Sequence, residues 1–221
     1  MLINADFSCR AWVLPEQQQW VASPQGGVER IMLDRVGAEK ARATSIVRYA
    51  PNSFFPQHSH PGGEEVLVLS GVFSEDNDHY PAGWYMRNPP GSRHQPSSLE
   101  GAVIFVKLWQ MRPTERSFVR VNTNDPNAWQ QGADRAECPL FADDIESVRL
   151  LRLDAGAVLL PAQVDGAEAF VLKGELTEGA QTYRESAWLR LPAGRYPDII
   201  AGPEGATVYL KTGPHTVVQP A

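Results

Sequence analysis

Residues 58–71 read HSHPGGEEVLVLSG and combine two histidines, two adjacent glutamates and an apolar run that ends at a glycine. Alternate side chains of a β-strand share one face, so His58 and His60 can point the same way while Ser59 points oppositely. The Pro-Gly-Gly turn after His60 lets the chain reverse. Glu64 then shares a face with the alternate valines that follow, and Glu65 lies on the other face. The stretch predicts a strand that brings several polar groups together.

Sequence patterns of the first half of the chain, including part of this stretch, recur in the second half. The segment LVLSG at 67–71 matches FVLKG at 170–174, NPPG at 88–91 matches LPAG at 191–194, and EGAVIFVK at 100–107 matches EGATVYLK at 204–211. The matching segments occur in the same order and are separated by a nearly constant number of residues, which predicts a tandem duplication. Its boundary falls in the polar segment 121–134, so we expect two domains, residues 1–120 and 121–221.

The fold class follows from the many short apolar runs bounded by Gly, Pro, Asn or Asp. Eighteen glycines and eighteen prolines suit frequent tight turns, and long helical periodicity is absent from the sequence. The sequence therefore predicts an all-β sandwich or barrel.

Composition limits the partners of the chain. Its 221 residues are 43% apolar and 21% charged, with a net charge of −6 and no basic run, so we expect no direct nucleic-acid binding. No apolar run reaches eighteen residues and the first residues do not resemble an export signal, so we expect no membrane segment and a cytoplasmic location. Cys9 and Cys138 stand alone, which predicts neither a disulfide framework nor a thiolate zinc site.

A further histidine, His94, ends the segment GWYMRNPPGSRH at 83–94, where a predicted strand meets a Pro-Gly turn. Three imidazoles and one carboxylate are suitable ligands for Fe, Mn, Ni, Cu or Zn and do not identify the metal. His58, His60 and His94 are therefore the predicted metal ligands together with one carboxylate, for which we favour Glu64 because six residues separate it from Gly71. Glu65 is expected to lie behind the ligands or at an interface.

The two segments together resemble the two cupin motifs. The first motif is HxH, three or four residues, E, six residues and G, and the second is G, five residues, PxG, two residues and H. Ser98 stands where the second motif usually ends in Asn. The resemblance implies that the four predicted ligands line a small jelly-roll barrel, also called a double-stranded β-helix, around one metal ion. With the duplication, it implies two tandem cupin barrels.

Two segments, residues 60–96 and FVKLWQ at 105–110, also resemble in sequence the cupin domain of ChrR-type anti-sigma factors. Those proteins bind their sigma factor through an additional N-terminal zinc-binding helical domain, and this chain opens directly into β-like sequence. We therefore expect no sigma-factor binding through this chain alone.

The second repeat lacks the predicted ligands. Aligning Pro56 with Pro161 places Gln163 and Asp165 opposite the two histidines of the first motif, Ala167 opposite Glu64, and Pro197 opposite His94. We expect no metal in the C-terminal cupin.

Two functions fit these patterns. The sequence resemblance to ChrR favours a regulatory or sensor module in transcription regulation that holds one Zn, Fe, Mn or Ni ion. The alternative is a non-haem metal-dependent dioxygenase acting on a small molecule. We expect a small-molecule ligand at the metal, which Arg87 or Arg93 could hold if it is anionic, and a homodimer. The sequence assigns no catalytic residue.

Overall fold

The structure is a computed structural model that describes residues 1–38 and 40–215. It confirms the expected all-β class, because within these residues the helical elements are two 3₁₀ turns, η1 (Pro15–Gln17) and η2 (Pro126–Ala128). None of the described helices is long and apolar enough to cross a membrane.

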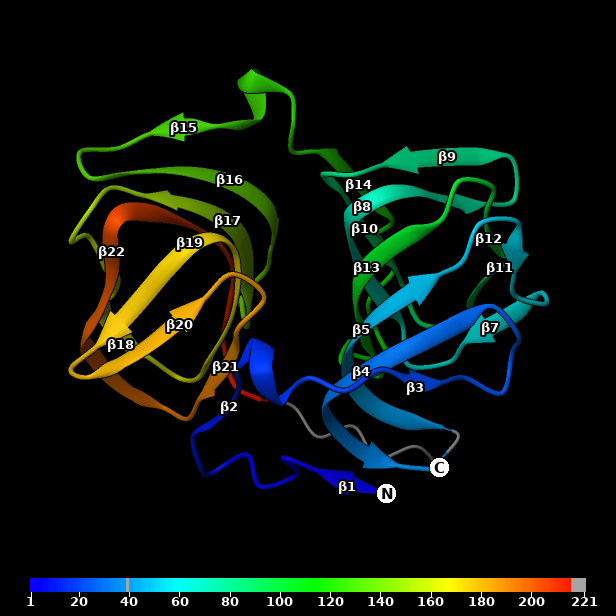
Figure 1. The fold of residues 1–221 in the computed structure, drawn as a ribbon, viewed down its shortest axis with the longest axis horizontal. Coiled ribbons are helices and arrows are strands. Elements are labelled where there is room, and N and C mark those ends of the chain that lie inside the picture. Colours follow the sequence, from blue (N-terminus) through cyan, green and yellow to red (C-terminus); the bar gives the residue numbers. More distant parts are fainter. Residues whose placement is uncertain (39, 216–221) are drawn as a thin grey trace. The chain divides into compact units, whose positions relative to one another are not determined.

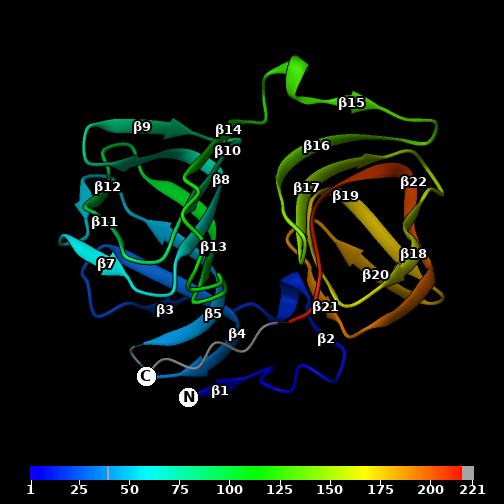
Figure 2. The ribbon, with the colours of Figure 1, turned by 180° about the vertical axis from the view of Figure 1, so that it is seen from behind.

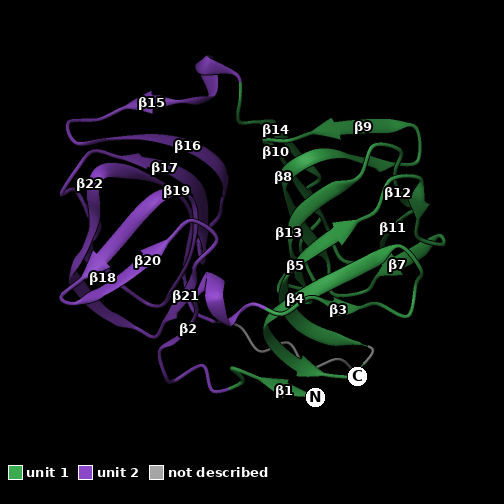
Figure 3. Cartoon of the chain, viewed as in Figure 1, with its two compact units in different colours: residues 1–5, 19–124, 216–221 green, residues 6–18, 125–215 purple. Residues whose placement is uncertain are grey.

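The strands divide between two compact units (Figure 3). Among the described residues, unit 1 holds residues 1–5 and 19–124, and unit 2 holds residues 6–18 and 125–215. The packing units therefore change at residue 124/125, four residues beyond the expected boundary. Residues 6–18 pack with the second half of the chain, whereas the expected division into 1–120 and 121–221 assigns them to the first domain. That division itself stays a prediction.

Unit 1 is built around the long strand β8, which pairs antiparallel with both β10 and β13. The central sheet runs β1-β4-β5-β13-β8-β10-β14, and a separate pair joins β7 to β11. The strands are β1 (Leu2–Ile3), β3 (Val21–Ala22), β4 (Val28–Gly37), β5 (Ala41–Tyr49), β6 (Ser53–Phe54), β7 (His58–His60), β8 (Glu64–Glu75), β9 (Asp78–Pro81), β10 (Trp84–Asn88), β11 (Ser92–His94), β12 (Pro96–Ser98), β13 (Ala102–Leu108) and β14 (Val119–Asn122). Figures 1 and 2 show β7, β11 and β12 gathered at one side of this unit.

A β-bulge divides β8 into two parts. Ser70 lies opposite Val103 and Val68 opposite Ile104, so Leu69 is the extra residue. A bulge moves the following side chains to the other face. Val66 and Val68 before the bulge and Phe73 after it accordingly belong to one buried cluster, although their numbers differ in parity. The first part of β8 pairs with β10 and β13, and the second part pairs with β9 and β12.

Unit 2 has an antiparallel sheet in the order β15-β16-β17-β22-β19-β21-β2. Its strands are β2 (Ala11–Val13), β15 (Gln130–Gln131), β16 (Arg135–Ala142), β17 (Ser147–Leu153), β18 (Val158–Val164), β19 (Ala167–Glu178), β20 (Gln181–Arg184), β21 (Trp188–Leu191) and β22 (Gly194–Thr212). The edge strand β2 comes from the N-terminal part of the chain and pairs with β21, with Trp12 opposite Leu189. Arg10 beside it forms a bidentate ion pair with Glu178.

The repeated sequence segments have the same backbone geometry in both units. In β19 the extra residue is Leu172, 103 residues after Leu69, so each unit carries a bulge at the same place. Gly71 and Gly174 both have a left-handed backbone, with φ of 70° and 73°. A methyl group on Gly71 would collide with the carbonyl oxygen of Gly101, and one on Gly174 with that of Gly205.

Replacing Gly71 tests this close approach. Gly71→Ala combines a left-handed alanine with a backbone collision, so we expect it to lower the free energy of unfolding by about 2–5 kcal/mol. Gly91→Ala is the matched control, since Gly91 has φ of 85° but open space where a methyl group would lie. It should lower the free energy of unfolding by about 1–2 kcal/mol. Denaturant titration of both variants measures the difference, and equal losses would contradict the steric argument.

Candidate metal centre

Three imidazoles meet where β7 pairs with β11. His94 lies directly opposite His58 in this pair, and Ser92 lies opposite His60. Ser59 and Arg93 alternate with these residues and are exposed, as period two requires. The ring centroids are 4.7 Å apart for His58 and His60, 5.1 Å for His58 and His94, and 4.7 Å for His60 and His94.

Glu64 joins the group from the first residue of β8. Its Oε2 lies 3.6 Å from His60 Nε2 and 3.5 Å from His94 Nε2, and the two Nε2 atoms are 2.8 Å apart. Glu64, His60 and His94 are all buried. At 2.8 Å the two ring nitrogens must share either a proton or a cation, because two bare lone pairs would repel each other.

Hydrogen bonds orient two of the rings. Nδ1 of His94 donates to Glu75 Oε1 at 2.7 Å, and Nδ1 of His58 donates to the carbonyl oxygen of Pro56 at 2.8 Å. Donation from Nδ1 leaves the Nε2 lone pair available in the neutral ring. This is the arrangement by which proteins fix the tautomer of a metal-binding histidine.

Glu75 is itself held on both sides. Asn88 Nδ2 donates to Glu75 Oε1 at 2.8 Å and to Glu64 Oε2 at 3.2 Å. Arg120 donates to Glu75 Oε2 at 2.7 Å and to Asn88 Oδ1 at 2.7 Å, and its Nε donates to the hydroxyl of Tyr80. The carboxylate that orients His94 therefore has few alternative positions.

The two neighbouring imidazoles differ in proton affinity. Burial lowers the pKa of His60, helped by the charges of His94 and His58 and opposed by that of Glu64. Burial acts in the same direction on His94, but the hydrogen bond to Glu75 and the charges of Glu64 and Glu75 raise its pKa above the ordinary value. Burial alone would raise the pKa of Glu75, and its contacts with His94, Arg120 and Asn88 lower it instead.

The residues present fit a transition-metal ion. Ligand atoms of His58, His60 and His94 lie within 4.8 Å of one another, as do those of Glu64, Glu75 and His94. Two ligand atoms on one ion, each about 2.1 Å away, can be at most about 4.2 Å apart. The separations of 2.8, 3.5 and 3.6 Å among the ligand atoms of His60, Glu64 and His94 satisfy this limit. Two or three imidazoles with a carboxylate suit zinc, iron, manganese or nickel.

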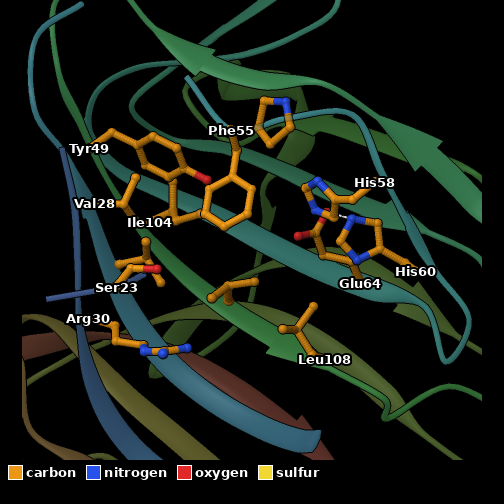
Figure 4. Close-up of a pocket in the computed structure, with 13 residues that line it drawn as sticks. Ser23, Val28, Arg30, Tyr49, Phe55, His58, His60, Glu64, Ile104 and Leu108 are labelled. Carbon is orange, nitrogen blue, oxygen red and sulfur yellow. Dashed lines mark ion pairs between the residues drawn. The ribbon is translucent and has the colours of Figure 1, made fainter. Parts of the chain in front are cut away.

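A pocket of about 130 Å³ opens beside these residues (Figure 4). His58, His60 and Glu64 form one part of its wall, and the apolar part is made by Val28, Val47, Phe55, Ile104, Val106 and Leu108. Tyr49 also lines it. Burial, with the charges of Glu64 and Glu75, raises the pKa of Tyr49 far above its ordinary value, so the group is a neutral phenol.

The structure brings the four predicted ligands together and separates the other predicted residues from them. Glu65 lies on the opposite face of β8, where Arg87 Nη1 donates to it at 2.9 Å. Arg87 is 1% exposed and also forms a bidentate pair with Glu115, so the expectation that Arg87 holds an anionic ligand is wrong. Arg93 is exposed on the outer face of β11 and does not line the pocket.

The sequence patterns did not identify Glu75, Asn88 or Arg120. Period two counted from Glu64 places Glu75 on the opposite face, and only the bulge at Leu69 returns it to the interior. Asn88 lies opposite Glu64 in the register of β10 and β8, so a correct strand pairing could have found it.

Comparison with known proteins gives one family match. Residues 8–112 match the model of the ChrR cupin-like domain. No curated protein sequence matches the chain.

Solved structures with the same fold are cupin-fold proteins. A candidate dioxygenase from Nostoc punctiforme has a TM-score of 0.74 at 14% identity and covers 97% of this chain and 85% of its own. A candidate glyoxylate-induced protein from Pseudomonas aeruginosa has a TM-score of 0.71 at 14% identity, with 96% and 91% covered. The pirin YhhW from Escherichia coli, in complex with nickel(II), has a TM-score of 0.71 at 14% identity, with 94% and 100% covered.

The hydrogen bond from His94 to Glu75 generates a prediction. Glu75→Gln keeps the size of the side chain but weakens its ability to accept from Nδ1, so we expect metal affinity to fall about 10- to 100-fold. Competition with a chromophoric chelator measures the change. The control Asp78→Asn removes an exposed carboxylate that pairs across from Glu75 in β9 and should leave the affinity unchanged. Equal affinities of Glu75→Gln and the unmodified protein would contradict the role of Glu75.

Proposed function

We propose that the chain, whose residues 8–112 match the model of the ChrR cupin-like domain, is a metal-binding bicupin with two tandem jelly-roll barrels. One divalent transition-metal ion, Zn, Fe, Mn or Ni, would be held in the N-terminal barrel by His58, His60, Glu64 and His94. The C-terminal barrel would hold none.

The convergence of the three imidazoles with Glu64 is the observation that carries the metal proposal. These groups are brought together from β7, β8 and β11, and hydrogen bonds from the Nδ1 atoms of His58 and His94 leave their Nε2 lone pairs available. The repeated bulge and the repeated glycine approach support the two-barrel architecture.

We propose that the bicupin works as a regulatory or sensor module. A bound transition-metal ion supplies a Lewis acid and, for iron, a centre that can react with dioxygen. Since any ligand that binds only the folded protein stabilises it, metal occupancy would be reported as a change in stability. The chain would act in the cytoplasm as a homodimer with a small-molecule ligand, and would bind no nucleic acid, membrane or sigma factor directly.

The pocket favours a second candidate, a metal-dependent dioxygenase that acts on a small molecule. His58 and His60 line the pocket wall, so a ligand in the pocket would lie beside the metal. The N. punctiforme structure of the same fold, described as a candidate dioxygenase, is compatible with this activity.

Metal content tests the shared part of both candidates. We expect elemental analysis of protein purified without chelators to find about one transition-metal ion per chain, and His60→Ala to lose it, because His60 Nε2 lies 3.6 Å from Glu64 Oε2 and 2.8 Å from His94 Nε2. The control His79→Ala removes an exposed imidazole of β9 and should keep the metal. Thermal unfolding after chelator treatment should occur at a lower temperature. Stoichiometric metal in His60→Ala would overturn the assignment of the ligands.

Oxygen consumption separates the sensor from the enzyme. Protein loaded anaerobically with iron is mixed with small ketones and aromatic acids, and dioxygen uptake is recorded. A sensor should take up at most one equivalent, whereas a dioxygenase should turn over repeatedly and lose this activity in His60→Ala.

A further inference from the structure

Arg30 is a cation on the interior face of unit 1. It follows Val28 by two residues in β4, and both side chains line the pocket beside the imidazoles. In the strand register Arg30 lies opposite Val47, another residue of the apolar wall. Figure 4 shows Arg30 on a different side of the pocket from His58, His60 and Glu64.

No carboxylate of the described residues pairs with the guanidinium of Arg30. Within residues 1–38 and 40–215, its side chain takes part in no hydrogen bond or ion pair, and its Nε is buried without a partner. A buried donor that gains no hydrogen bond costs stability, and a cation beside apolar walls costs more. Its neighbour Glu29, by contrast, points outward and pairs with Arg48.

The space around Arg30 is suited to a compact organic molecule. The inner pocket of about 130 Å³ is slightly smaller than an apolar cavity of roughly 150 Å³ that binds benzene. A larger cavity of about 540 Å³ adjoins it and shares Arg30, His58 and His60 as lining residues. Lys40 at this outer cavity adds a second positive charge, which would attract anions.

We propose that the pocket binds a small monocarboxylate with a compact apolar body, and that Arg30 is the residue that selects its negative charge. The guanidinium would pair with the carboxylate, which matches its planar donor geometry. The apolar body would contact Phe55, Ile104 and Leu108, and its far end would lie toward the imidazoles. The contact made by this far end rests on the proposed function, because the metal would lie there. The contact with Arg30 is independent of the metal.

Titration with benzoate and benzamide tests this proposal, since the two molecules share a shape and differ in charge. We expect the unmodified protein to bind benzoate about 10- to 100-fold more tightly than benzamide, and Arg30→Met to lose this preference. Arg48→Met removes one positive charge from the outer face of β5 and should keep the preference. Calorimetry measures binding with chelator-treated and with metal-loaded protein, and circular dichroism checks that each variant is folded.

The outcomes distinguish this inference from the proposed function. A charge preference that depends on Arg30 in both protein forms supports the monocarboxylate site, even if elemental analysis finds no metal and the metal proposal fails. Equal binding of benzoate and benzamide by the unmodified protein, or an unchanged preference in folded Arg30→Met, overturns it. Metal content should be the same in Arg30→Met and the unmodified protein, because Arg30 makes no contact with the predicted ligands.

Discussion

The burial of two carboxylates in one sheet interior is the constraint on which the architecture of unit 1 depends. Glu64 and Glu75 are each 6% exposed, and a buried carboxylate is tolerated only with positive charge or hydrogen-bond donors around it. Glu75 has Arg120, Asn88 and His94. Glu64 has the Asn88 amide and two imidazole nitrogens at 3.5 and 3.6 Å, distances too long for strong hydrogen bonds. A cation among the three groups would complete the charge balance.

The sequence could predict the part of this site that follows from local spacing. Period two and the turn after His60 were enough to bring His58, His60 and Glu64 to one place, and the short apolar runs bounded by turn residues indicated the all-β class. Glu75, Asn88 and Arg120 depend instead on a bulge, on strand register and on a distant edge strand, which spacing does not encode. The same limit explains Arg87, which was a candidate for anion binding but lies on the outer face beside Glu65 and Glu115.

The two units use one backbone frame for different purposes. The described interior of unit 2 is a large apolar cluster that includes Leu151, Val171, Leu189 and Val208. Unit 1 has a smaller apolar cluster, since part of its interior is occupied by the charged site and its pocket. Polar sites of this kind cost stability in the domain that carries them. After a duplication, the copy without imidazoles at the matching positions has no such cost.

The placement of β2 has a consequence for biosynthesis. Residues 11–13 leave the ribosome long before their partner β21 at 188–191 has been made. Unit 2 therefore cannot complete this sheet edge until β21 has been translated. A nascent chain would leave β2 unpaired while unit 1 is synthesised, so the pairing of β2 with β21 is a late step in the maturation of unit 2.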